Sequence, residues 1–164
     1  MSNFLKDIIK SSGNEYAGIV SEGIEGSDVT GFIDTGSYAF NALLSGSLYG
    51  GIPNNKIMAL AGESATGKTY FALGMCKKFL DDNPEGMILY FDTESAVTSD
   101  MITERGLDPS RVAVFPVATV EGFRHQAISI VDKYIENKEK KPVFVVLDSL
   151  GMLSTEKEMT DTAE

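Results

Sequence analysis

Residues 57–69 read IMALAGESATGKT, and this stretch decides the fold. Its first five residues form a continuous apolar run of strand length, and the pattern G-x-x-x-x-G-K-T follows at 62–69. Apolar residues then recur at helical spacing from Phe71 to Leu80. A strand, a glycine-rich loop and a helix in this order predict a phosphate-binding loop (P-loop), because the loop N–H groups and the helix N-terminus can face an anion.

Three more apolar runs of strand length follow the P-loop. They cover residues 87–91, 112–115 and 143–147, and helices are expected to begin near Ser99 and after Thr119. Strands that are apolar throughout are typical of a parallel sheet with both faces covered. The sequence therefore predicts an α/β fold, a P-loop NTPase core with a mostly parallel sheet of four strands and helices on both faces.

The residues before the P-loop are less regular. An amphipathic helix is expected at residues 2–11, a glycine-rich linker extends to Gly31, and a further helix is expected at 37–44. We expect residues 1–31 to be a separate segment and a candidate for self-association. Residues 32–154 form the core in this interpretation, and residues 155–164 are a polar, acidic tail.

The residue types in the P-loop indicate their roles. Lys68 can reach the β- and γ-phosphates of a nucleotide, and Thr69 offers a hydroxyl group to Mg²⁺. The predicted cofactors are therefore ATP and Mg²⁺. The residues expected to contact the nucleotide are Gly62, Glu63, Ser64, Ala65, Thr66, Gly67, Lys68, Thr69 and Tyr70.

Two carboxylates are candidates for the rest of the site. Asp148 ends the run at 143–147 in a Walker B pattern and is expected to help hold Mg²⁺. Ser149 follows it, so the group that activates water for hydrolysis must come from elsewhere in the chain. Glu94, just beyond the run at 87–91, is the candidate together with Lys68 for the chemical step. The alternative interpretation is that Asp92 and Glu94 are solvated loop acids.

The order and spacing of these motifs resemble the RecA family. The set comprises FIDTGS (32–37), LLSG (43–46), GGIP (50–53), the P-loop, FDTE (91–94) and LDSLG (147–151). Within the family the chain is most similar to the UvsX group, the strand-exchange recombinases of tailed phages, through GLDPSRV (106–112) and DSLG (148–151). The similarity extends from about residue 29 to residue 154.

The resemblance implies an ATP-dependent recombinase that assembles on single-stranded DNA during homologous recombination and repair. It places Lys68 and Thr69 on phosphates and Mg²⁺, Asp148 on Mg²⁺ through water, and Glu94 on the hydrolytic water. It also implies that the chain self-associates into a filament or ring. The rival functions are a replicative helicase or KaiC-like ATPase of the same superfamily, and a nucleotide-binding regulatory module that does not hydrolyse ATP.

The chain departs from the family pattern at two points. Met101 stands five residues before Gly106, where the family usually has an aromatic residue against adenine. A thioether can still cover a purine face, so Met101 is a candidate for base contact. The chain also stops at Glu164, before the family's DNA-binding loops. We therefore expect a core truncated after the Walker B strand, with its contacts to single-stranded DNA mainly beyond residue 164.

The composition agrees with this division. The 14 Lys and Arg residues against 24 Asp and Glu give a net charge of −10, which repels phosphate backbones and anionic membranes. The single cysteine, Cys76, permits no disulfide within the chain. No apolar run approaches the ~18 residues that span a bilayer, and no signal peptide is evident. A cytoplasmic location without membrane contact is expected, in the host cytoplasm if a phage encodes the protein.

Overall fold

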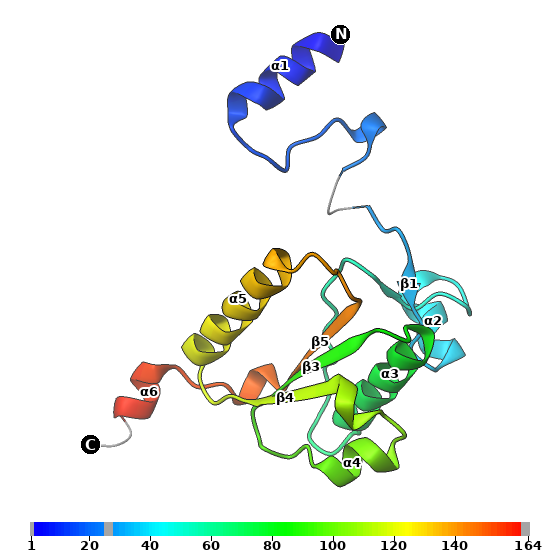
Figure 1. Cartoon of the computed structure of the whole chain (residues 1–164), viewed down its shortest axis with the longest axis vertical. Helices are drawn as coiled ribbons and strands as arrows, with labels where there is room; N and C mark the ends of the chain where they lie inside the picture. The colour runs from blue at the N-terminus through cyan, green and yellow to red at the C-terminus, as the bar shows by residue number, and fades with distance from the viewer. Residues whose placement is uncertain (1, 25–27, 162–164) are drawn as a thin grey trace. The chain divides into compact units, whose positions relative to one another are not determined.

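The computed structural model describes residues 2–24 and 28–161 and divides the chain into two compact units, one ending at Leu60 and one beginning at Ala61 (Figure 1). The elements of the first unit are α1 (Ser2–Ser12), a 3₁₀ turn (Val20–Glu22), β1 (Phe32–Ile33), α2 (Tyr38–Ser45) and β2 (Ile52–Pro53). The helices expected at 2–11 and 37–44 are therefore confirmed, whereas the antiparallel pair of β1 and β2 was not predicted.

A buried asparagine organises the end of the first unit. Asn41 is fully buried, and its side-chain oxygen accepts hydrogen bonds from the backbone N–H and the hydroxyl of Thr35 at 3.0 and 2.7 Å. Its amide group donates to Asp34 and to the carbonyl of Leu48. These bonds tie α2 to the loops on either side of it.

The second unit is built on a parallel sheet with the strand order β4-β3-β5. Its elements are α3 (Lys68–Asp82), β3 (Met87–Asp92), α4 (Ser99–Glu104), a 3₁₀ turn (Pro109–Arg111), β4 (Val112–Pro116), α5 (Val120–Glu136), β5 (Val143–Asp148), a 3₁₀ turn (Leu150–Met152) and α6 (Glu156–Asp161). The predicted α/β class with a parallel sheet is confirmed.

The strand predicted at residues 57–61 is wrong. Residues 57–63 have no regular secondary structure, and Ile57 is fully exposed. An apolar run becomes a strand only where a second strand supplies hydrogen-bond partners, and none pairs with this run in the described part of the chain. The parallel sheet therefore has three strands among the described residues instead of four.

The remaining elements follow the predicted order closely. The hydroxyl of Thr119 accepts a hydrogen bond from the N–H of Gly122 and caps α5, as expected. The helix expected from Ser99 ends just before Gly106, which has a positive φ of 70°. Helix α6 was also not predicted, because the polar tail that contains it has no apolar period.

Helices α3 and α5 cover opposite faces of the sheet (Figure 1). Phe79 of α3 stacks on Phe144 of β5 with ring centroids 5.4 Å apart. Phe91 of β3 meets Phe123 of α5 edge-on at 5.0 Å. Since successive strand residues point to opposite faces, the side chains of β3 alternate between the two helices. Among the described residues, no helix is long and apolar enough to cross a membrane.

Candidate functional site

The P-loop leads directly into the N-terminus of α3. The N-cap residue, Gly67, has a left-handed conformation with φ 90°, and Ala65 is also left-handed with φ 61°. No side chain caps the helix, and within the described residues the N–H groups of residues 64–69 donate to no acceptor. These exposed donors and the helix dipole are an arrangement that can bind an anion.

Two side chains hold the loop in shape through three hydrogen bonds. The Thr66 hydroxyl donates to the carbonyl of Glu63 at 2.8 Å. The Lys68 ammonium group donates to the carbonyls of Gly62 and Glu63 at 2.9 and 2.7 Å. Because an ammonium group has three N–H donors, one remains for a phosphate oxygen. Lys68 is the first residue of α3, and its contact with a phosphate stays a prediction.

Thr69 and Asp148, predicted to share a metal site, are in direct contact. The Thr69 hydroxyl in the first turn of α3 donates to Oδ2 of Asp148 at 2.6 Å, across 79 residues of sequence. Asp148 is the last residue of β5, and the parallel register pairs it with Asp92 at the end of β3. The fold therefore places a hydroxyl group and a carboxylate beside the P-loop.

Tyr90 is a further contact of Asp148 that the sequence analysis missed. Its hydroxyl donates to the same Oδ2 atom at 2.7 Å, and the residue is fully buried in β3. Burial, followed by the hydrogen bond to Asp148, raises the pKa of Tyr90 above its usual range, so that the hydroxyl remains a donor. The available signal was a tyrosine in an otherwise apolar strand, since a buried hydroxyl needs a partner.

Asp92 shapes the loop that carries Glu94. Asp92 is only 3% exposed, and its carboxylate accepts hydrogen bonds from the N–H groups of Glu94 and Val97 at 3.1 and 2.9 Å. It is therefore not a solvated loop acid. Glu94 is exposed, and its Oε1 accepts a bond of 3.4 Å from the hydroxyl of Ser149.

The loops that follow β3 and β5 are joined to each other. The N–H of Ser149 donates to the hydroxyl oxygen of Thr93 at 2.8 Å, and that hydroxyl donates to the Ser149 carbonyl at 3.1 Å. The N–H of Thr93 also donates to the carbonyl of Asp148 at 2.9 Å. The positions of Glu94 and Asp148 are consequently linked through the backbone.

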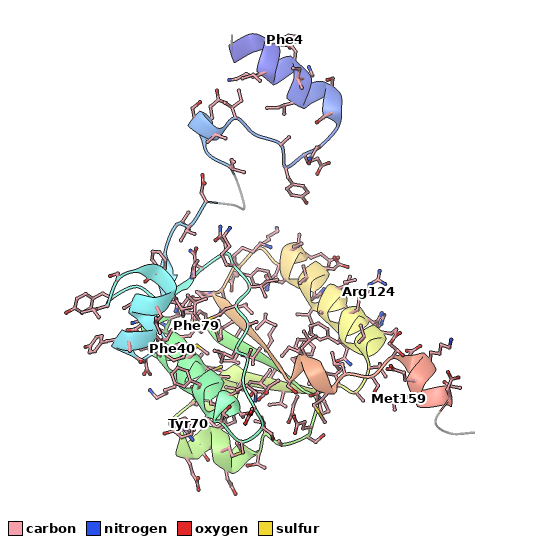
Figure 2. All side chains as sticks on the ribbon, turned by 180° about the vertical axis from the view of Figure 1, so that it is seen from behind. Phe4, Phe40, Tyr70, Phe79, Arg124 and Met159 are labelled. Carbon is pink, nitrogen blue, oxygen red and sulfur yellow. The ribbon has the colours of Figure 1, made fainter. Side chains whose placement is uncertain are left out.

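Tyr70 and α4 form the side of the site where a base contact was predicted. Figure 2 labels Tyr70 at the start of α3 beside α4, and the guanidinium carbon of Arg105 lies 3.1 Å from the centre of its ring. Tyr70 is 62% exposed, and Met101 in α4 is half-buried. The cation–π contact connects the P-loop helix to α4. The contact of Met101 with a base stays a prediction.

The oxygen atoms of Thr69 and Asp148 fit a magnesium ion that a nucleotide brings with it. In the described part of the chain, no group of three or more His, Cys, Asp or Glu residues could hold a metal. Magnesium commonly binds through one or two protein oxygen ligands, with phosphates and water completing its shell. The arrangement can therefore bind a polyphosphate and its metal ion together.

Comparisons with known proteins find relatives of similar sequence, although no protein-family model matches the chain. The chain is 36% identical over 121 residues to the "Recombination and repair protein" of Enterobacteria phage T4, a match covering 74% of this chain and 30% of the relative. It is 31% identical over 115 residues to "Protein RecA" of Malacoplasma penetrans, which covers 70% of this chain and 32% of the relative.

A third relative, "Protein RecA" of Mycoplasmopsis pulmonis, is 29% identical over 155 residues, covering 94% of this chain and 42% of the relative. The chain thus matches less than half the length of each of these relatives. The parallel sheet, the P-loop and two relatives above 30% identity all support membership of one family. The chain belongs to the RecA family of recombination proteins.

Proposed function

We propose that this chain contains the ATP-binding and ATP-hydrolysing core of a recombinase that assembles on single-stranded DNA. The observation that carries the proposal is the hydrogen bond between Thr69 and Asp148, which joins the P-loop helix to the end of β5. Family membership supports the recombinase assignment. In this proposal, residues 1–31 contribute to self-association.

Each residue of the site has a role in the proposed reaction. The N–H groups of residues 64–69 bind the phosphates, and Lys68 approaches the β- and γ-phosphates. Thr69 and Asp148 hold Mg²⁺, and Glu94 orients the attacking water and accepts its proton. When bound, Mg²⁺ neutralises charge that develops on the phosphates during in-line attack. Electrostatic stabilisation is therefore the main contribution expected from the protein.

Steady-state ATP hydrolysis with Mg²⁺, with and without single-stranded DNA, tests the proposal. Lys68→Ala should reduce both nucleotide binding and turnover. Glu94→Gln should lower turnover roughly 100-fold or more while leaving nucleotide binding unchanged, because it removes only the base. The matched control is Glu136→Gln on the exposed end of α5, which should hydrolyse ATP as the wild type does.

The outcomes separate the proposal from a regulatory module that does not hydrolyse ATP. Unchanged turnover in Lys68→Ala would contradict the enzyme assignment. Tight ATP binding without hydrolysis, even with DNA and a full-length relative present, would favour the regulatory module. Stimulation by single-stranded DNA would mean that this chain itself contacts DNA.

A further inference from the structure

Tyr90 of β3 has a hydroxyl group that is buried beside Asp148. The residue lies in the central strand and is fully buried, and its hydroxyl is 2.7 Å from Oδ2 of Asp148. A phenylalanine ring would fill the same space in an apolar core. Packing therefore explains the aromatic ring at this position but not the hydroxyl group.

The carboxylate of Asp148 receives two O–H donors on one oxygen atom. Thr69 donates to Oδ2 at 2.6 Å and Tyr90 at 2.7 Å, whereas none of the described groups donates to Oδ1. Hydrogen bonds from a hydroxyl to a carboxylate are short and about twice as strong as those between neutral groups. Two of them from fixed elements, α3 and β3, restrict rotation of the carboxylate.

The two donors differ in what they can do when a metal ion is present. The Thr69 hydroxyl is itself a predicted metal ligand, so its geometry must adapt to the ion. The Tyr90 hydroxyl comes from the central strand, where the ring is enclosed by the core and cannot follow the ion. Tyr90 is thus the stationary contact of the carboxylate.

We propose that Tyr90 is a positioning residue for Mg²⁺: it holds Oδ2 of Asp148 and thereby keeps Oδ1 available to the metal and its water shell. The inference rests on the proposed function, because it concerns the metal that accompanies the nucleotide. Partners that orient a metal-binding carboxylate typically change metal affinity 10- to 100-fold when they are removed.

The experiment measures ADP binding by calorimetry at increasing MgCl₂ and again in excess EDTA. Tyr90→Phe keeps the ring and removes only the donor. It should raise the Mg²⁺ concentration for half-maximal enhancement of ADP binding about tenfold. ADP affinity in EDTA should be unchanged, which a general loss of structure would not allow.

The matched control removes a tyrosine hydroxyl elsewhere. The Tyr134 hydroxyl of α5 donates to the Lys141 carbonyl at 2.6 Å, outside the candidate site, so Tyr134→Phe should keep the wild-type Mg²⁺ dependence. Placing 3-fluorotyrosine at position 90 retains the hydroxyl donor and should keep the wild-type Mg²⁺ dependence of ADP binding. Because this variant keeps the hydroxyl, it controls for a change in the ring, and ADP affinity in EDTA reports whether Tyr90→Phe is folded.

A double-mutant cycle identifies Asp148 as the route of the effect. In an Asp148→Asn background, Tyr90→Phe should not weaken the Mg²⁺ dependence further, since coupled residues give non-additive effects. An additive effect would overturn the inference. An equal loss of ADP affinity with and without Mg²⁺ would also overturn it. So would a Tyr90→Phe protein that has the wild-type Mg²⁺ dependence.

Different results would contradict the proposed function and the inference about Tyr90. If the wild type binds ADP no better with Mg²⁺ than in EDTA, and Lys68→Ala binds it equally well, the proposed function and this inference both fall. If the wild type responds to Mg²⁺ and Lys68→Ala does not bind, while Tyr90→Phe matches the wild type, only the inference falls.

Discussion

Asp92 is a carboxylate in the interior whose charge is met by backbone donors. It is 3% exposed, and the N–H groups of Glu94 and Val97 both donate to it. One donor reaches Oδ1 and the other Oδ2, so both oxygen atoms are needed. The shape of the loop that carries Glu94 therefore depends on the chemistry of one side chain.

The substitution Asp92→Asn should destabilise the protein and also impair hydrolysis. An amide group presents a donor where one N–H needs an acceptor, and a buried unpaired group costs about 1–3 kcal/mol in the free energy of unfolding. Turnover should fall more than nucleotide binding, because Glu94 loses its support. Urea unfolding and ATP hydrolysis would measure the two effects.

The control for this substitution is Asp132→Asn on the exposed surface of α5. It makes the same chemical change outside the site and should alter stability by less than about 0.5 kcal/mol. If Asp92→Asn behaved like Asp132→Asn, the two backbone bonds to Asp92 would not be what orders the loop.

Sequence reasoning could place those residues of the candidate site whose positions follow from local spacing. The P-loop residues are consecutive, and Asp148 ends an apolar run, so their meeting at one edge of a parallel sheet could be anticipated. The partners of Tyr90 and Asp92 could not be predicted. Tyr90 reaches across 58 residues of sequence to Asp148, and only the register of β3 and β5 brings them together.

At the scale of elements, the end of α3 shows how one side chain completes a helix. The last carbonyls of a helix have no partner within it. The Arg111 guanidinium group donates to the Leu80 carbonyl at 3.3 and 3.2 Å, to the Gly86 carbonyl at 2.9 Å and also to the Asn83 carbonyl. Arg111 thus joins α3 to the start of β4.

Arg111→Lys should be destabilising although it keeps the charge. A lysine ammonium group cannot reproduce the planar set of donors that serves these three carbonyls. The loss of hydrogen bonds from a charged group predicts about 1.5–3 kcal/mol lower free energy of unfolding, which urea titration would measure.

Arg124→Lys is the matched control for this change. Arg124 is exposed, and its side chain extends from α5 into solvent (Figure 2). The free energy of unfolding of Arg124→Lys should remain within about 0.5 kcal/mol of the wild-type value. Equal effects of the two substitutions would mean that the contacts at the end of α3 add nothing to stability.

Helices are predictable here because their boundaries are local. The cap at Thr119 and the glycine at 106 mark helix ends in the sequence itself. The run at 57–61 has the composition of a strand, but the strand state also depends on a hydrogen-bonding neighbour. The short pair of β1 and β2 has two residues in each strand, which is too few for a periodic pattern.

At the scale of the whole molecule, the net charge of −10 opposes binding to nucleic acid. The candidate site is nevertheless suited to anions, because its donors are backbone N–H groups, a helix N-terminus and Lys68. Such short-range fields act within the first turn of a helix, whereas the net charge acts over the Debye length of about 8–10 Å. Nucleotide binding and repulsion of DNA by the rest of the surface are therefore compatible in one chain.

The buried thiol of Cys76 links the stability of the second unit to alkaline pH. Cys76 is 0% exposed on α3, and burial raises the pKa of its thiol from 9.0 to about 12. In the unfolded chain the thiol ionises from its ordinary pKa, so unfolding releases a proton between these two values. The contribution of the Cys76 thiol to the free energy of unfolding is therefore fully present below pH 9. It is lost as the pH rises towards 12.

Cys76→Ala separates this effect from the titration of other groups. The variant should be less stable than the wild type at pH 8, because it leaves a cavity against the sheet. From pH 9 to pH 10 the difference in the free energy of unfolding between the wild type and Cys76→Ala should narrow by up to about 1.4 kcal/mol. The reason is that only the wild type loses a thiol proton on unfolding. Lysine and tyrosine residues are common to both proteins and cancel in the difference. Urea unfolding under reducing conditions at pH 8, 9 and 10 measures it, and a difference that stays constant would show that the Cys76 thiol titrates alike in the folded and unfolded states.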